Sequence, residues 1–297
     1  MPIGELAAFG NAVLGAATLS LFTYVSDRIG VFTQNLLRLL AGTVILGIIH
    51  YLYTGQIFES YENQRQLYYL IISGIVGYSI GDIFLFRSNV MLGPRLGTLV
   101  FMSYVPMATI MAVPALNEKL GFQAFFGMVI TLIGITMVVM AQKGSLSKFQ
   151  PKNLPLGILF GLIGAFCNAF GLVLSKLGMI GNSATVMNAS FVRLVAATAT
   201  IWLTGFMLGR NKHVLKSVYD IKLLGIIIIG SFIGPYLSVW FALIAMRHTY
   251  TGIATTIMAL TPVIIIPMAQ ITHKERITPQ IILGTITAIA GAALLFI

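Results

Sequence analysis

Long apolar segments alternate with short polar connections along the whole chain. Ten segments reach the ~20 residues that an α-helix needs to cross a bilayer. Turn and helix-start residues separate them, as at Gly93-Pro94 and at Thr278-Pro279, where a threonine N-cap precedes proline at the first helical position. The pattern predicts an all-α polytopic membrane protein with ten transmembrane helices. The expected helices cover residues 4–25, 32–53, 67–90, 95–116, 121–141, 155–177, 186–208, 222–246, 251–271 and 279–297.

The composition agrees with this prediction and narrows the function classes. Of 297 residues, 58% are hydrophobic and 9% are charged, whereas soluble domains carry about 25% charged residues. The net charge of +10 comes mostly from basic residues in the connections, so we interpret it as membrane topology and not as nucleic-acid binding. The single cysteine, Cys167, excludes a disulfide within the chain.

The two halves of the chain repeat each other. Charged residues, prolines and glycines recur in the same order at an offset of 155–157 residues. The matched pairs are Arg38 and Arg193, Pro106 and Pro262, Glu118 and Glu275, Gly127 and Gly284, and Gly134 and Gly291. Each repeat, residues 1–145 and 152–297, contains five helices. Because five is odd, the second repeat enters the membrane from the opposite side, and such inverted repeats hold a binding site between the halves near the midplane.

The basic residues predict an orientation in the membrane. The odd-numbered connections carry eleven Lys and Arg residues and the even-numbered ones carry four. By the positive-inside rule, the odd-numbered connections face the cytoplasm and both termini face outward.

Asp82 is the acidic residue that lies well inside an apolar segment. It is about 22 Å along its helix, and a carboxylate at that depth costs about 2.5–3.5 kcal/mol. It is either a proton or cation site facing a cavity or one half of a permanent salt bridge. Arg87 lies about 140° around the helix from Asp82, so it is not the obvious partner. Arg38 lies nearer the same membrane face as Asp82 and is the better candidate by depth. Pro235 occupies nearly the equivalent repeat position, so the acid exists in one half only.

The repeat pattern resembles a known group, the EamA-type ten-helix branch of the drug/metabolite transporter superfamily. The resemblance rests on Arg38 and Arg193 early in equivalent helices, on the paired prolines, and on Glu118 and Glu275 before a Gly-spaced last helix. It implies a central cavity lined by the first, third, fourth, sixth, eighth and ninth helices. Members move amino acids, nucleotide sugars, metabolites and drugs, often outward and in part coupled to protons. The family usually places both termini inside, opposite to the charge count.

Polar and aromatic residues on the helices assigned to the cavity are the candidate substrate-binding residues. They are Asn11, Asp82, Asn89, Ser103, Tyr104, Asn168, Tyr236 and Trp240. Asp82 is also the candidate for proton coupling. The asparagines could equally bond neighbouring helices, and the aromatic pair could pack in the protein interior.

Four further residues are candidates for gating or for structural roles. Arg38 and Arg193 bind either interfacial carbonyls and lipid phosphates or a solute carboxylate. Pro106 and Pro262 are expected to kink their helices mid-span, for rocking motion or for packing. At the connections, we interpret Glu118 and Glu275 as capping residues that pair with Lys119 and Arg276. Lys176 either extends to the membrane interface or reaches into the vestibule of the cavity. Small residues in the fifth and tenth helices, Gly127, Thr131, Gly134, Gly284, Ala288 and Gly291, allow close helix approach within one chain, which favours a monomer over a dimer.

The sequence contains no Cys/His metal spacing, nucleophile elbow or Gly-rich phosphate loop, so we expect no enzyme, metal or cofactor. The expected function is secondary active export of a small organic metabolite such as an amino acid by alternating access, with proton coupling as an option. The expected partners are this solute and membrane lipid, and the expected location is a prokaryotic cytoplasmic membrane. The alternatives are an uncoupled facilitator or channel, and a non-transporting scaffold or lipid-modifying enzyme.

Overall fold

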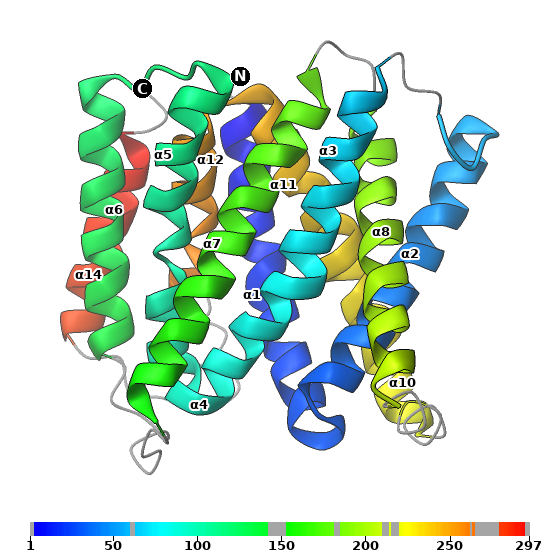
Figure 1. Ribbon diagram of the computed structural model, residues 1–297. Coiled ribbons are helices and arrows are strands. Elements are labelled where there is room, and N and C mark those ends of the chain that lie inside the picture. The colour runs from blue at the N-terminus through cyan, green and yellow to red at the C-terminus, as the bar shows by residue number, and fades with distance from the viewer. Residues whose placement is uncertain are drawn as a thin grey trace.

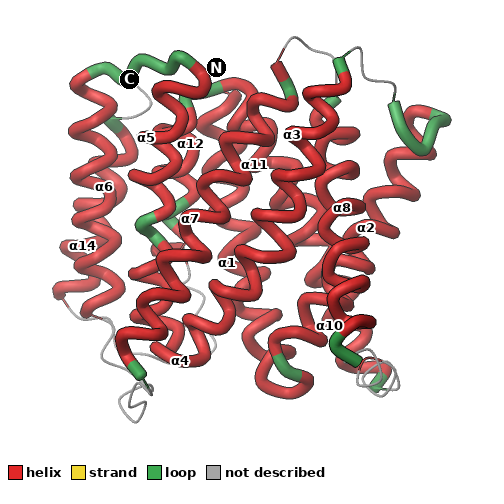
Figure 2. The backbone as a smooth tube through the Cα atoms, in the orientation of Figure 1, coloured by secondary structure: helices red, strands yellow, loops and turns green. Residues whose placement is uncertain are grey.

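The chain folds into a bundle of long helices. The computed structural model describes residues 3–59, 63–141, 153–180, 185–209, 214, 220–261, 263–264 and 279–294. Within these ranges the secondary structure is helical, without strands, and the helices run side by side with short connections at their ends (Figures 1 and 2). The prediction of an all-α polytopic membrane protein with two five-helix repeats is confirmed.

Most helices follow the predicted segments, but the turn predicted at Gly93-Pro94 is wrong, because one helix runs through these residues to Phe101. In the first repeat they are α1 (Ile3–Ile29), α2 (Val31–Thr54), α3 (Gln64–Gly74), η1 (Ile75–Gly81), α4 (Asp82–Phe101), α5 (Tyr104–Leu116) and α6 (Phe122–Ala141). In the second they are α7 (Leu154–Gly178), α8 (Val186–Met207), α10 (Ile221–Ser231), η3 (Phe232–Ser238), α11 (Val239–His248), α12 (Thr251–Met258) and α14 (Pro279–Ala293). The third predicted segment is therefore built from α3, η1 and the first part of α4, and the eighth from α10, η3 and α11.

The connections alternate between two faces of the bundle. Helices α2, α5, α7 and α11 end on one face of the bundle, where α1 begins and α14 ends (Figure 1). We call this the termini face. Helices α1, α6 and α8 end on the other face, called here the basic face because the odd-numbered connections in the sequence carry most of the Lys and Arg residues. This alternation is the one that an inverted five-helix repeat requires.

A π-helical segment interrupts the same helix in each repeat. η1 covers Ile75–Gly81 and η3 covers Phe232–Ser238, which are separated by 157 residues at both ends. Single π turns within α-helices often mark functional sites. This register matches Asp82 with Val239, so the pairing of Asp82 with Pro235 inferred from the sequence is wrong by four residues. The acid still has no counterpart in the second repeat.

Contacts between equivalent residues reveal the approximate two-fold axis that relates the repeats. The hydroxyl oxygens of Thr43 in α2 and Thr198 in α8 lie 2.7 Å apart, and the two residues are equivalent at an offset of 155.

At the periphery α6 packs on α14 through the predicted small residues. A Cβ atom added to Gly134 would lie 2.3 Å from the Ala288 nitrogen, and one added to Gly291 would lie 2.4 Å from the Thr131 nitrogen. The glycines thus permit close packing within one chain.

Replacing Gly134 by alanine should lower the melting temperature of the purified protein, because the new methyl group would force α6 and α14 apart at a cost of about 1–3 kcal/mol. Gly225 in α10 is the matched control, since an added Cβ there would meet no atom within 4 Å. Both substitutions make the same gain in helix propensity. Thermal unfolding in one detergent compares the two variants, and equal melting temperatures would contradict the proposed close packing.

Candidate functional site

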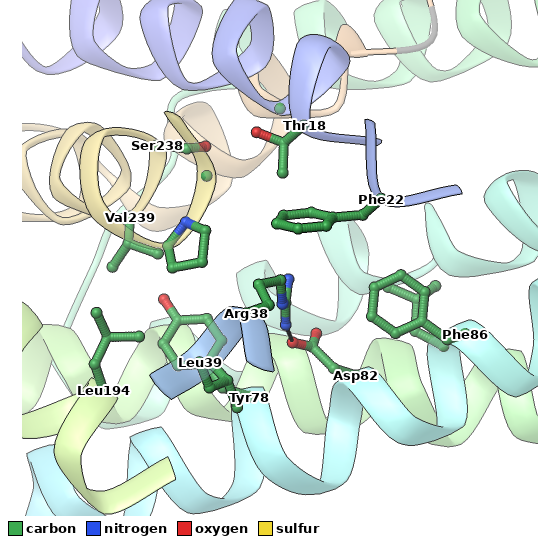
Figure 3. Close-up of a pocket in the computed structure, with 14 residues that line it drawn as sticks. Thr18, Phe22, Arg38, Leu39, Tyr78, Asp82, Phe86, Leu194, Ser238 and Val239 are labelled. Atoms are coloured by element: carbon green, nitrogen blue, oxygen red, sulfur yellow. Dashed lines mark hydrogen bonds and ion pairs between the residues drawn. The ribbon is translucent and has the colours of Figure 1, made fainter. Parts of the chain in front are cut away.

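A cavity of about 190 Å³ lies between the two repeats. Its walls come from α1, α2, η1 and α4 in the first repeat and from α8, η3 and α11 in the second (Figure 3). The lining residues are Gly15, Thr18, Phe22, Arg38, Leu39, Tyr78, Asp82, Leu85, Phe86, Leu194, Gly234, Pro235, Ser238 and Val239. Most of the wall is apolar, with one pair of opposite charges in it. Both π-helical segments contribute to the walls.

Arg38 and Asp82 form that charged pair. The Arg38 Nη2 group donates to an Asp82 carboxylate oxygen and also to Asn35 Oδ1 at 2.7 Å. Asn35 lies one turn before Arg38 on α2, and its amide donates to the Tyr78 carbonyl oxygen at 3.4 Å. The arginine is therefore held at two points, and the interpretation of Arg38 as the partner of Asp82 is confirmed.

Aromatic rings complete the surroundings of the Arg38 guanidinium. The rings of Phe22 and Phe86 lie 5.6 and 5.5 Å from its central carbon. Their faces attract the cation and keep water from it. The Ser231 hydroxyl donates to the Arg38 carbonyl oxygen at 3.1 Å, which joins α2 to α10 of the other repeat. The first repeat thus surrounds the guanidinium group, and the second repeat fixes the backbone of Arg38.

The repeat-related arginine, Arg193, reaches the same helix one turn earlier. Its guanidinium carbon lies 4.6 Å from the centre of the Tyr78 ring, as a cation over an aromatic face. Arg193 is 1% exposed and is among the largest fully buried side chains of the described residues. The two arginines therefore meet one helix at residues 78 and 82, but in different surroundings.

The asparagines among the predicted binding residues lie outside this cavity wall. The amide of Asn11 donates to the Ser238 carbonyl and hydroxyl oxygens at 2.7 and 2.9 Å, which ties α1 to η3 beside the cavity. Asn89 lies close to Gly97, and its side-chain oxygen is buried without a hydrogen-bond partner. Asn168 lies on α7 where that helix packs against Gly81. A role of these three residues in binding a solute stays a prediction.

The remaining predicted residues lie deeper in the bundle or beside the cavity. Tyr104 donates to the Thr255 carbonyl oxygen at 3.0 Å and Ser103 to the Val100 carbonyl oxygen at 2.7 Å. The rings of Tyr236 and Trp240 stack at 6.3 Å with an angle of 6° between them. Their contact with a solute also stays a prediction.

Of the two predicted kinks, one falls within the described residues. The helix breaks after Phe101 and restarts at Tyr104, so Pro106 lies in the first turn of α5, where proline is tolerated. Pro262 lies outside the described residues, as does Glu275.

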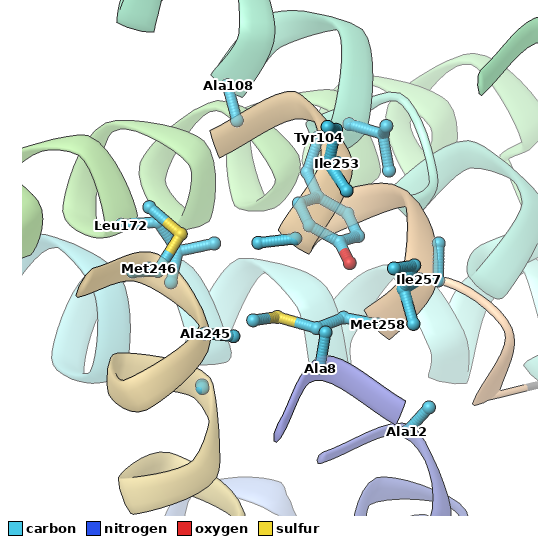
Figure 4. Close-up of a cluster of buried hydrophobic side chains, with 14 of the residues drawn as sticks. Ala8, Ala12, Tyr104, Ala108, Leu172, Ala245, Met246, Ile253, Ile257 and Met258 are labelled. Atoms are coloured by element: carbon cyan, nitrogen blue, oxygen red, sulfur yellow. The ribbon is translucent and has the colours of Figure 1, made fainter. Parts of the chain in front are cut away.

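Packed side chains close the cavity toward the termini face. Tyr104, Met246 and Met258 meet Ala8 and Ala12 of α1 in a buried apolar cluster (Figure 4). Small residues on α1 let the helices approach closely there. The cavity lies on the other side of this cluster, near the start of α2, and so in the half of the molecule nearer the basic face.

A polar network, which we call the latch, joins the repeats at the termini face beyond that cluster. Lys176 Nζ lies 2.7 Å from Glu118 Oε1 and donates to the Thr249 carbonyl oxygen at 2.5 Å. The other Glu118 oxygen accepts from the Thr251 nitrogen at 2.7 Å, and the Thr249 hydroxyl donates to Glu5 at 2.8 Å. Glu5 and Glu118 belong to the first repeat, and the other three residues belong to the second.

The latch corrects two expectations from the sequence. Glu118 was expected to pair with its neighbour Lys119, and Lys176 to extend to the membrane interface or into the vestibule. Instead they pair with each other, and their side chains are 5% and 16% exposed. A buried carboxylate needs a cation and several donors, and only the packed helix ends supply both.

Asn35, Phe22 and Thr18 were missed as site residues by the sequence reasoning. Asn35 had a usable signal, because it precedes Arg38 by three residues and so shares its helix face. Phe22 and Thr18 had none, since aromatic and hydroxyl residues are common in any transmembrane helix.

Comparison with known proteins decides the family. The family model described as the EamA-like transporter family matches residues 2–140 and 155–297, one match for each repeat. The chain belongs to the EamA-like transporter family. It is therefore a multi-pass membrane transporter of the drug/metabolite transporter superfamily that acts on a small-molecule solute. A solved structure titled "Crystal structure of protein" shares the fold with this EamA-like transporter at a TM-score of 0.75 and 17% identity, covering 99% of this chain and 98% of that one. No curated protein matches the chain.

Proposed function

We propose that this EamA-like transporter is a secondary active transporter that exports a small zwitterionic metabolite such as an amino acid. The observation that carries the proposal is the Arg38–Asp82 pair in the wall of a small apolar cavity. Opposite charges side by side match the carboxylate and ammonium groups of an amino acid. The cavity is also smaller than the ~300–1,000 Å³ typical for drug-sized ligands.

The ion pair would allow the transporter to change between its two open states both with and without bound solute. Without solute, Arg38 and Asp82 neutralise each other, so no isolated charge is buried. With solute, Arg38 binds the carboxylate, and Asp82 binds either the ammonium group or a proton. Proton coupling at Asp82 therefore belongs to the step in which Arg38 and Asp82 separate.

The position of the cavity supports export. The cavity lies nearer the basic face, which the positive-inside rule assigns to the cytoplasm. A solute from the cytoplasm would reach Arg38 first and leave through the latch. The proposal includes a prokaryotic cytoplasmic membrane as the location and a monomer as the working unit.

Proteoliposomes loaded with radiolabelled L-leucine test the proposal, because leucine combines both charges with an apolar side chain that suits Leu39, Leu85 and Leu194. Two analogues of the same shape are the controls: L-leucine methyl ester lacks the carboxylate, and 4-methylpentanoate lacks the ammonium group. Both analogues cross a bilayer unaided in their neutral forms, so they are used as unlabelled competitors of leucine transport. Unlabelled leucine should inhibit the transport at a concentration at least tenfold lower than either analogue. An imposed pH gradient should drive leucine against its concentration gradient, which a facilitator or channel cannot achieve. Equal inhibition by leucine and its ester, or no transport of leucine, would contradict the proposal.

A further inference from the structure

Arg193 is a buried cation for which the described part of the chain supplies no anion. Its Nε and Nη1 groups have no hydrogen-bond partner, and its guanidinium carbon lies over the Tyr78 ring. Leaving guanidinium donors unpaired inside a protein is costly. An ionisable residue kept at membrane depth despite that cost is by default a candidate functional residue.

The backbone around Arg193 repeats the arrangement around Arg38. Ser231 contacts the Arg38 carbonyl oxygen, and Gly74, which precedes Ser231 by 157 residues, packs on the Arg193 carbonyl. An added Cβ at Gly74 would lie 2.2 Å from that oxygen. The two arginines therefore occupy equivalent sites on helices related by the two-fold axis, and their side chains differ only in what they meet.

That difference comes from one residue. Arg38 turns toward the helix that follows it in its own repeat and meets Asp82 there. The corresponding residue for Arg193 is Val239, which lines the cavity. Arg193 instead lies against Tyr78, another lining residue, and its neighbour Leu194 lines the cavity too. The Tyr78 ring is thus in contact with both the cavity and the guanidinium group.

A transporter built from inverted repeats opens first to one membrane face and then to the other around a fixed binding site. When it changes state, each repeat takes the conformation that the other repeat had before. In that exchanged arrangement Arg193 would take the position relative to α11 that Arg38 has relative to α4. It would then enter the cavity beside Val239, without a carboxylate to neutralise it. Arg38 has Asp82 in the protein itself, whereas Arg193 requires an anion from the solute.

We propose that Arg193 is a second anion-binding residue, which holds the carboxylate of the solute when the cavity opens toward the termini face. This inference rests on the proposed function and extends it, because the solute passes from one arginine to the other as the carrier changes state. The carboxylate is thereby required on both sides of the membrane, and the ammonium group only where Asp82 can reach it.

Inside-out and right-side-out membrane vesicles separate the two arginines. Uptake of L-leucine is measured from each side for the wild type, R193Q and R38Q, with L-leucine methyl ester as competitor. R193Q should raise the half-saturating leucine concentration at least tenfold from the termini-face side only, and should abolish the preference for leucine over its ester on that side. R38Q should have its effect from the basic-face side. An R193Q effect that is equal from both sides, or absent, would overturn the inference.

Two further measurements keep the test decisive. R193K retains the charge without the planar fork and should give a smaller increase, of about threefold, on the same side; it replaces R193Q if that variant fails to reach the membrane. If the wild type transports no leucine, the proposed function fails by itself. Thermal stabilisation of purified R38Q and R38Q/R193Q by 4-methylpentanoate then tests Arg193 alone, because Arg38 can no longer hold the carboxylate in either protein. Equal stabilisation of the two proteins contradicts anion binding at Arg193.

Discussion

Replacing Asp82 by asparagine should abolish pH-driven leucine transport and lower the melting temperature by roughly 10 °C. Removal of the carboxylate leaves the Arg38 charge buried with one partner fewer, and breaking a buried pair from one side costs about 3–5 kcal/mol. In a chain of this size each kcal/mol corresponds to roughly 2–4 °C. Uptake into proteoliposomes with an imposed pH gradient and thermal unfolding in detergent measure the two effects.

The double variant R38Q/D82N is the matched control for this prediction. It removes both charges and leaves two amides that can hydrogen-bond each other, so it should recover most of the lost stability. The double variant should still fail to transport leucine, because the carboxylate and ammonium groups of leucine no longer have a charged residue to bind. Full pH-coupled transport by D82N would contradict the role of Asp82, and recovered transport in the double variant would show that the pair is structural.

The repeat and the pairing of Asp82 could be predicted from the sequence because both rest on charges in apolar surroundings. A charged residue at membrane depth is rare, so its recurrence at a fixed offset is informative, as for Arg38 and Arg193. The same rarity leaves few possible partners for Asp82. The angle around the helix then excluded Arg87 as the obvious partner, and depth in the membrane favoured Arg38.

The shape of the cavity could not be predicted, because it depends on how closely particular helices approach. Glycines let the third and sixth predicted helices touch: an added Cβ at Gly171 would lie 3.1 Å from Gly77, and one at Gly164 would lie 2.9 Å from the Leu85 nitrogen. This contact places Asn168 in a packed interface. The cavity forms on the other side of η1 instead, against α1 and η3, where Thr18 and Pro235 line it.

The latch was missed for a different reason. Glu118 has a lysine beside it in the sequence, and a local pair is the simplest expectation at a helix connection. Its actual partner, Lys176, is on a helix of the other repeat, and the threonines that complete the network belong to a third connection. The local sequence does not indicate which helix ends are in contact in the folded protein.

Locking the latch with a disulfide should stop transport completely and reversibly. Gly4 of α1 and Thr249 lie side by side there, and a Cβ added to Gly4 would be 2.9 Å from the Thr249 Cβ. A small backbone adjustment brings this to the ~3.5–4.5 Å of a disulfide. The variant G4C/T249C, with Cys167 replaced by alanine, should lose leucine transport on oxidation and regain it after reduction, because exit toward the termini face requires these residues to separate.

The single-cysteine variants G4C and T249C, treated in the same way, control for the substitutions and the oxidant. Mass spectrometry of the oxidised double variant verifies the cross-link. Binding of leucine from the basic face should survive in the locked protein, since the Arg38–Asp82 pair lies beyond the apolar cluster that closes the cavity. Transport at the wild-type rate by fully cross-linked protein would mean that the latch face does not open, and the solute would then need another exit.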